Sequence, residues 1–516
     1  MSIAQVAQSL RRSAVPDHWS LFFGQIAVAS FVICSLSGIF VMFFYEPSTA
    51  PVTYEGSYAG LRGIEMSRAL ESTVHLSFEV RGGLLMRQLH HWSASVMIAA
   101  VMMHLLRIFF TGAFRKPREL TWLLWFGILL VAMSAGLAGH ILPDDSLSGT
   151  SLLVMDGLLK GIPIIGTWLS SMVFQGRFPT GVIDTFYPLH TIILPAIIVV
   201  FMIAIGLLNL RYRSAHFRGP GRTESNIVGR PFTVTLVKSF GLFCIVFGVL
   251  FVMAAVAQVN PVWTYGSADP SVASAGGAAL WYLAFLDGAQ RLVPPGWEFV
   301  LFDHSWTPAI VVPLAVGGLF FLTAMIYPFI ERWITGDDAE HQRLVRPRTT
   351  PTRTGIGVAG MVFYGVLWIA AGSDVMAFYF SLSNENLILI LQIFLILGPV
   401  LGFTLTKRIC LSLQFKDRDI AMNGFETGRI LCSPDGEFTE VHRSADAYQL
   451  WTLTDYEYYE PFIPRPDERG RIGLKDRLRA RLSRWFFEDR VVPPRVSEVA
   501  DPPADISAST KQDEQE

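Results

Sequence analysis

The sequence predicts an all-α membrane protein with eight transmembrane helices and a small C-terminal tail. Of its 516 residues, 51% are hydrophobic and 16% are charged, a balance that favours a membrane protein over soluble domains. The apolar residues gather in eight runs, each long enough to cross a hydrocarbon layer of about 30 Å as a helix. These runs cover residues 21–45, 88–106, 120–143, 185–210, 239–260, 305–330, 354–373 and 386–406.

Three parts are expected along the chain. They are an N-terminal four-helix bundle, a C-terminal membrane region with a long outer loop, and a cytoplasmic tail, over residues 1–230, 231–410 and 411–516. Residues 1–20 predict an amphipathic lead-in on the membrane surface. The apolar segment 161–176 is too short to span and is broken by a proline and a glycine, so it predicts an interfacial helix.

The tail carries four local signals. Short strands are expected around FTEVH (438–442) and YQLWTLT (448–454), because both are rich in β-branched and aromatic residues. Residues 475–490 form a basic amphipathic helix candidate, suited to a membrane surface or a partner. From about residue 491 the composition of proline, aspartate, serine and alanine predicts disorder.

The distribution of lysine and arginine predicts the orientation. The loops after spans two, four and six hold fifteen of these residues, whereas the opposite loops hold seven. Basic residues are retained on the cytoplasmic side. The N-terminus, these three loops and the C-terminal tail are therefore expected to be cytoplasmic.

The second span carries two histidines on one helical face. His90 and His104 are fourteen positions apart, which is nearly four turns and roughly 21 Å along a helix. Imidazole inside a membrane helix is costly without a partner, so each is a candidate functional residue; a hydrogen bond to a neighbouring helix is the alternative. His91 points about 100° away and is interpreted as an interfacial polar residue.

Span four supplies a partner for the first of these histidines. Its single histidine, His190, lies a turn or two after the start of the span. Because spans two and four both run inward, His90 and His190 reach the same outer depth, as a bis-histidine haem requires. The four cysteines form no CxxCH motif, so any haem would be held non-covalently.

Other residues fit a haem site less specifically. Arg87 and Arg107 flank the histidines and can donate to haem propionates, or they can serve as interfacial anchors. Gly127, Gly136 and Gly139 in span three allow either a flat cofactor or another helix to approach the backbone.

The outer loop, about residues 261–304, contains a candidate proton acceptor. Glu298 lies in VPPGWEF and can serve a hydroxylated ligand at the membrane surface; a solvated loop carboxylate is the alternative. Asp303 and His304 can extend such a site. The sequence contains no nucleotide-binding glycine loop, zinc spacing or nucleophile elbow.

These motifs resemble cytochrome b, the haem and quinone subunit of cytochrome bc complexes, in its actinobacterial form. The resemblance covers about residues 15–445 and implies a plasma-membrane quinol–cytochrome c oxidoreductase subunit that oxidises quinol at the outer side. It also implies a Rieske-type iron–sulfur subunit and a c-type cytochrome subunit as partners, a dimeric complex surrounded by lipid, and no nucleic acid. The matching runs are PDHWS, SFEVRGGLLMRQLHHW, FFTGAFRKPRE, LPDDSLSGT, LHTIILP, GPGRTESN and ETGRI.

The resemblance further implies two haems b between the second and fourth spans. His90 and His190 match the ligands of the outer haem, and His104 matches one ligand of the inner haem. The second inner ligand should follow His190 after 13 or 14 intervening residues, where this chain has Ala204 and Ile205. Neither side chain can ligate iron, so the inner haem is expected to be five-coordinate, unusually ligated or absent.

Two nearby residues could supply an unusual ligand. Met202 has a thioether that can ligate haem iron, although membrane-facing packing explains it more simply. His216 lies beyond the span, 26 positions after His190, which is too far without a break in the helix.

The quinol motif also departs from the family. Members generally have Pro-Glu-Trp-Tyr, and actinobacterial members have Pro-Pro-Trp-Glu. Here a glycine separates the prolines from the Trp-Glu pair, in the order Pro294, Pro295, Gly296, Trp297 and Glu298.

The leading hypothesis is a quinol-oxidising cytochrome b subunit, with Glu298 as the proton acceptor. A divergent paralogue with one functional outer haem and another electron acceptor is the first alternative. A non-redox assembly scaffold is the second, and the retained pair of His90 and His190 argues against it.

Overall fold

A computed structural model describes most of the chain. The described residues are 14–179, 181–219, 221–269, 271, 280–294, 296–301, 304–454, 456, 459–466 and 471–494. Most of the expected amphipathic lead-in and most of the expected disordered tail lie outside these residues, and so does Asp303.

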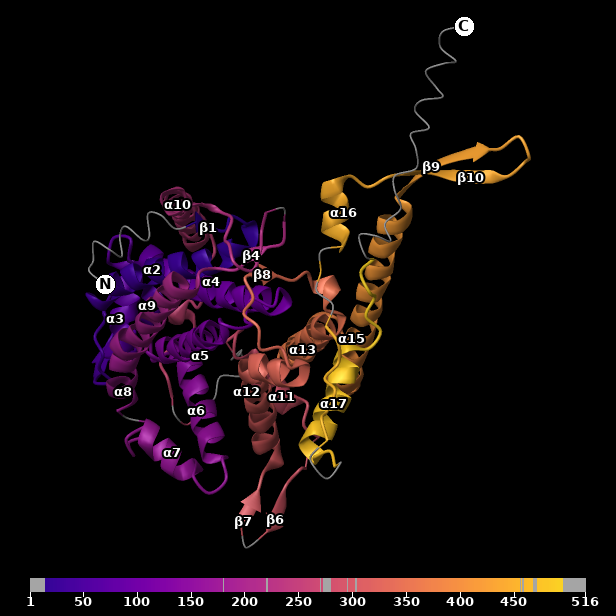
Figure 1. The fold of residues 1–516 in the computed structure, drawn as a ribbon. Coiled ribbons are helices and arrows are strands. Elements are labelled where there is room, and N and C mark those ends of the chain that lie inside the picture. Colours follow the sequence, from indigo (N-terminus) through magenta and orange to yellow (C-terminus); the bar gives the residue numbers. More distant parts are fainter. Residues whose placement is uncertain are drawn as a thin grey trace.

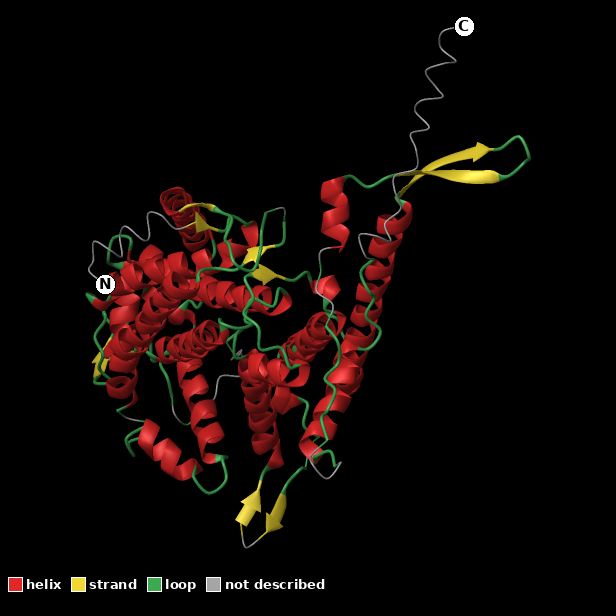
Figure 2. Ribbon diagram, in the orientation of Figure 1, coloured by secondary structure: helices red, strands yellow, loops and turns green. Residues whose placement is uncertain are grey.

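The described chain is mostly helical, and its short strands form small two-stranded sheets (Figures 1 and 2). Eight spans within the described residues are long and apolar enough to cross a membrane, which confirms the predicted number. Their main helices are α2 (Phe22–Met42), α4 (Gly83–Phe110), α5 (Glu119–Ile141), α9 (Leu194–Tyr212), α10 (Phe232–Val256), α12 (Pro308–Thr335), α13 (Pro351–Ala370) and α15 (Asn384–Asn423).

The last helix is longer than its apolar run. α15 has 40 residues and is therefore about 60 Å long at ~1.5 Å per residue. Its second half is rich in charged residues, so it extends beyond the expected span of 386–406.

The fourth span is interrupted. It consists of α8 (Val182–Pro188), a π-helical turn (Leu189–Ile193) and α9. Pro195 has no N–H to donate to the preceding turn, which favours irregular hydrogen bonding there. Such π-helical turns are frequent at functional sites, and this one contains His190.

Shorter elements connect the spans. The short helices are α3 (Arg68–Phe78), α6 (Ser146–Lys160), α7 (Gly166–Val173), α11 (Ala284–Arg291), α14 (Ser373–Tyr379), α16 (Ala447–Thr454) and α17 (Leu474–Phe487). The strand pairs are β1 (Ala14–Val15) with β5 (Arg230–Pro231), β2 (Pro51–Thr53) with β3 (Glu65–Ser67), β4 (His216–Phe217) with β8 (Arg343–Leu344), β6 (Phe299–Leu301) with β7 (His304–Trp306), and β9 (Phe425–Cys432) with β10 (Phe438–Arg443). Only β4 and β8 pair in parallel among these.

Most local predictions agree with these elements. α7 is the expected short helix within 161–176, β10 contains FTEVH, and α17 matches the basic helix. The strand predicted for YQLWTLT is wrong, because this segment forms α16. Asp446 and Gln449 each accept a hydrogen bond from the other's backbone N–H, at 2.7 and 3.1 Å, and this capping box starts a helix despite the strand-favouring residues.

The helices form two groups that meet in one core (Figure 1). α2, α4, α5 and α9 pack together, and α10 packs against α2 and α4. α11, α12, α13 and α15 form the second group, which contacts the first through α12 on α5 and α13 on α4. Large side chains from both groups fill the shared core, including Trp122, Phe126, Phe285 and Tyr327. The division into domains at 231 and 411 stays a prediction.

The loops after spans two, four and six lie on one face. Arg118 donates to the His341 carbonyl at 2.6 Å, and Arg343 pairs with Glu224 at 2.8 Å. The N-terminal segment reaches the same face, where Asp17 pairs with Lys238 at 2.7 Å. The basic loops therefore share a side, as their composition predicts.

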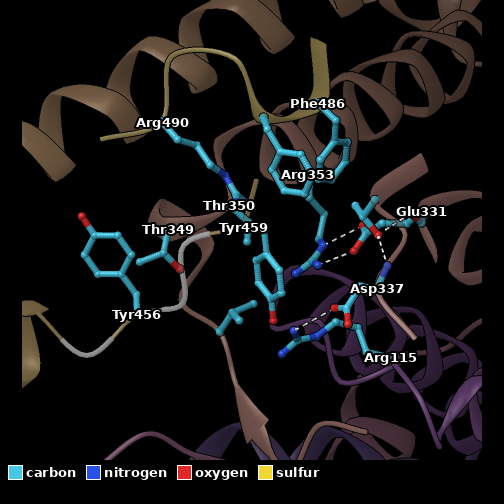
Figure 3. Close-up of a pocket in the computed structure, with 13 residues that line it drawn as sticks. Arg115, Glu331, Asp337, Thr349, Thr350, Arg353, Tyr456, Tyr459, Phe486 and Arg490 are labelled. Atoms are coloured by element: carbon cyan, nitrogen blue, oxygen red, sulfur yellow. Dashed lines mark hydrogen bonds and ion pairs between the residues drawn. The ribbon is translucent and has the colours of Figure 1, made fainter. Parts of the chain in front are cut away.

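The C-terminal segment is fastened to this face around a buried ion pair (Figure 3). Arg353 of α13 donates from Nε to Glu331 of α12 at 2.8 Å and makes a second contact through Nη2. Tyr459 and Phe486 cover the pair and line a cavity of about 30 Å³, which has space for no more than about two water molecules. The cluster therefore joins elements rather than binding a ligand.

Breaking this pair should destabilise the protein. Glu331→Gln leaves the buried Arg353 charge without its counter-ion, and the expected loss is about 3–5 kcal/mol of unfolding free energy. Denaturant unfolding of the purified protein in detergent measures it. The matched control is Glu46→Gln at the exposed pair with Arg68, where less than about 1 kcal/mol is expected. Equal losses in the two variants would contradict this role.

Candidate haem site

The structure brings His90 and His190 face to face. His90 lies on α4 and His190 on the π-helical turn before α9. Their ring centroids are 6.0 Å apart and their planes are inclined by 83°. Two imidazoles on one metal ion require about 6 Å, because each metal–nitrogen bond is about 2 Å long and the ring centre lies about 1 Å behind the nitrogen. The separation therefore fits one iron between the rings.

The second nitrogen of each ring is fixed by a backbone carbonyl. His90 Nδ1 lies 2.9 Å from the Cys34 carbonyl oxygen, and His190 Nδ1 lies 2.8 Å from that of Ala135. A carbonyl can only accept, so Nδ1 carries the proton in both rings. This tautomer leaves the Nε2 lone pair free for a metal.

Glycines make room for these two rings. A Cβ atom on Gly38 of α2 would lie 2.9 Å from His90 Cε1, and one on Gly139 of α5 would lie 2.4 Å from His190 Cε1. Any other residue would displace the ring. Gly127 and Gly136 face Phe201 and Tyr282 instead, so only Gly139 among the three predicted glycines adjoins the histidine pair.

Arg87, near the start of α4, has a donor suited to an anionic group. Its Nη2 donates to the Asn260 carbonyl at 3.0 Å, and its guanidinium lies 5.5 Å from the centre of the Trp263 ring. Its Nε is buried and has no hydrogen-bond partner among the described residues. A buried donor without a partner is costly, and a haem propionate would satisfy it. The residues at this depth therefore fit haem b.

The deeper histidine has different surroundings. His104 is buried, and its ring centroid lies 4.4 Å from that of Trp125. Its Nδ1 has no partner within the described residues. Among the described residues no second histidine is brought to His104, so this position does not fit a bis-histidine haem.

The residues considered as inner ligands or anchors have other contacts. Ile205 is buried in the core, and Met202 packs against the same core. Arg107 donates to Ser20 Oγ at 3.4 Å and lies 5.9 Å from the centre of the Phe217 ring. It is therefore held by protein groups.

His216 is also hydrogen-bonded within the protein. It belongs to β4, and its Nε2 donates to the Thr223 carbonyl at 3.2 Å while Nδ1 accepts from the Val228 N–H at 3.2 Å. Burial lowers the pKa of His216 below its usual range. Both ring nitrogens are used, so His216 has none left for iron.

Glu298 lies on the outer loop, apart from the histidine pair. Its side chain is exposed between α11 and β6, at the base of the hairpin of β6 and β7 that projects from the molecule (Figure 1). The structure does not bring it together with His90 or His190. Its proposed neighbour Asp303 lies outside the described residues, as does the side chain of His304.

An apolar groove of about 450 Å³ opens between α5, α11 and α12. Its volume is within the usual range for small-molecule sites. The Tyr282 hydroxyl lies against the backbone of Gly136 on α5, beside the groove residues Met133 and Leu137. Apart from one serine and one glycine, the lining is apolar, for example Leu130, Met133, Phe285, Phe321 and Met325. Three separate segments form it, so no single stretch of sequence could indicate it.

Comparisons with known proteins identify the family. The model for "Cytochrome b(N-terminal)/b6/petB" matches residues 95–267. The chain is 42% identical over 507 residues to the cytochrome bc1 complex cytochrome b subunit of Streptomyces coelicolor, covering 96% of this chain and 93% of that one. The subunit of the same name from Mycobacterium tuberculosis is 44% identical over 434 residues, which are 83% of this chain and 78% of that one.

A solved structure supports the fold. A chain described as hyperthermophilic respiratory Complex III aligns with a TM-score of 0.59 and 18% identity, covering 79% of this chain and 96% of that one. At this identity the likeness shows the fold alone. The sequence relatives carry the assignment, and the chain belongs to the family of cytochrome b subunits of the cytochrome bc1 complex.

Proposed function

We propose that this chain oxidises quinol near the outer membrane surface and transfers electrons through a haem b held by His90 and His190. The observation that carries this proposal is the 6.0 Å separation of the two rings, each with Nδ1 bonded to a carbonyl. Haem b bound there would supply one-electron redox chemistry. A non-redox scaffold would have no use for two imidazoles poised in this way.

The chain's own residues have separate tasks in this proposal. His90 and His190 would hold the iron, Gly38 and Gly139 leave space for the rings, and Arg87 Nε would donate to a propionate. The apolar groove between α5, α11 and α12 suits the hydrophobic part of a quinol, because it is lined almost entirely by apolar side chains.

Oxidation of a quinol releases two protons with two electrons, so the site needs a proton acceptor. Glu298 follows α11, which lines the groove, and its exposed carboxylate can pass a proton to water. The groove and Glu298 are both reached from the outer loop. We propose that quinol oxidation takes place on the side opposite the basic loops, and that these loops are cytoplasmic together with both termini.

The sequence relatives are subunits of cytochrome bc1 complexes. On that basis we propose a Rieske-type iron–sulfur subunit and a c-type cytochrome subunit as partners, a dimeric complex, and a bacterial plasma membrane as the location. A divergent paralogue with a single outer haem and another electron acceptor is the second candidate, and the packing around His104 is consistent with its single haem.

His190→Ala should remove the low-spin haem b signal of the outer site, because a single imidazole cannot form the bis-histidine complex. The reduced-minus-oxidised spectrum of the purified complex measures this. His216→Ala is the matched control, since both of its ring nitrogens are bonded within the protein, and its spectrum should be unchanged. An unaltered spectrum in His190→Ala would refute the ligand assignment.

Glu298→Gln should slow quinol–cytochrome c reduction by about 10²-fold or more, because an amide cannot accept the proton. Haem content should stay at the wild-type level. The control is Glu65→Gln, another exposed carboxylate of an outer loop, for which no change in rate is expected. A rate for Glu298→Gln within twofold of the wild type would show that another group takes the proton.

A further inference from the structure

The sequence repeats part of the haem site at a second depth. His90 and His104 are fourteen positions apart on α4, and Gly38 and Gly24 are fourteen positions apart on α2. Each glycine adjoins one histidine: a Cβ on Gly24 would lie 2.9 Å from His104 Cε1, the same distance as from Gly38 to His90 Cε1. α2 and α4 therefore present the same local geometry at both depths.

The third helix breaks this repeat. Gly139 of α5 adjoins His190 at the outer depth, but fourteen positions earlier α5 has Trp125. Trp125 is 7% exposed, and its ring lies 4.4 Å from His104 at an angle of 58°. A tryptophan buries roughly 150–250 Å² of surface. At the inner depth α5 thus presents an indole against His104, where at the outer depth it presents a glycine that makes room for the second imidazole.

The fourth span has no histidine at the inner depth, and the structure shows which residue lies there instead. The π-helical turn at Leu189–Ile193 rotates less per residue than an α-helix. One extra residue is therefore needed to return to the face of His190, which favours Ile205 over Ala204. Ile205 is 5% exposed and shares a buried cluster with Trp125, whereas Ala204 is partly exposed.

The polar contacts at the outer and inner positions also differ. His90 and His190 have Nδ1 bonded to carbonyls, which orients a ligand, whereas His104 Nδ1 has no partner among the described residues. Arg87 has a buried Nε without a partner there, but Arg107 Nε is bonded to Ser20 Oγ. The outer position therefore has two imidazoles oriented by carbonyls and a free arginine donor, whereas at the inner position His104 lacks an orienting carbonyl and packs against Trp125.

We infer that Trp125 and Ile205 close the inner haem position, so that the chain holds a single haem b, between His90 and His190. This inference rests on the proposed function, because it takes that pair as the remaining site. His104 is then a packed residue of the core. Electrons reaching the outer haem would find no second haem of this chain in the inner leaflet.

The haem count of the intact complex tests this directly. The pyridine haemochromogen of the purified complex should give one haem b per copy of this chain, and a redox titration of the b absorbance should show one wave. Two haems b per chain would overturn the inference and leave the proposed function standing. No haem b would overturn the proposed function, and the inference with it.

Two variants test the roles of the named residues. His104→Ala should leave the haem b count and the midpoint potential unchanged, whereas loss of a haem would show that His104 is a ligand. The pair Trp125→Gly with Ile205→His recreates the outer arrangement at the inner depth and should raise the count to two. Trp125→Phe is the control and should keep one haem b per chain.

The double variant remains informative if it is less stable, because the outer haem reports its folding. A double variant that retains the outer haem signal but gains no second haem would contradict the claim that these two side chains close the position.

Discussion

The architecture of the outer site follows from one constraint, which is that polar side chains within membrane-spanning helices need partners. His90 and His190 each satisfy one nitrogen with a backbone carbonyl, from Cys34 and Ala135. These carbonyls are fixed by α2 and α5, the helices that also provide Gly38 and Gly139. Helix packing and ring orientation are therefore coupled: a shift of either helix would move a hydrogen bond and a glycine contact together. The remaining Nε2 atoms have no such partner among the described residues, and a haem iron would satisfy both.

The same constraint separates the two ends of α4. At His90 the bundle leaves one ring nitrogen and one arginine donor without a protein partner, so binding a haem relieves a cost. At His104 the indole of Trp125 covers the imidazole, and burial of apolar surface stabilises that arrangement instead. A haem there would have to displace a buried tryptophan and an isoleucine of the core without gaining a second iron ligand. The loss of packing would be offset by at most one iron bond, the bond to His104.

Much of the fold could be predicted from the sequence because the bilayer dictates helix length and composition. The eight spans, the outer pairing of His90 with His190 and the gathering of basic loops on one face follow from this. The π-helical turn could not be predicted, since it depends on hydrogen bonds that are shared between turns. α16 was missed because a capping box outweighed the strand preference of its residues, and the 40 residues of α15 exceeded its apolar run.

The candidate site was only partly predictable for a related reason. Histidine stands out in an apolar run, but carbonyl anchors have no signature in residue type, and a tryptophan there looks like ordinary packing. The spacing is more informative than the residue type. The fourteen-position interval that relates Gly38 to Gly24 also relates Gly139 to Trp125. A haem site needs space as well as ligands. Counting histidines leaves open whether an unusual ligand could complete the inner site, whereas the place of Trp125 shows that space is lacking too. Two separate requirements, a second iron ligand and space for the macrocycle, are therefore unmet at the same depth.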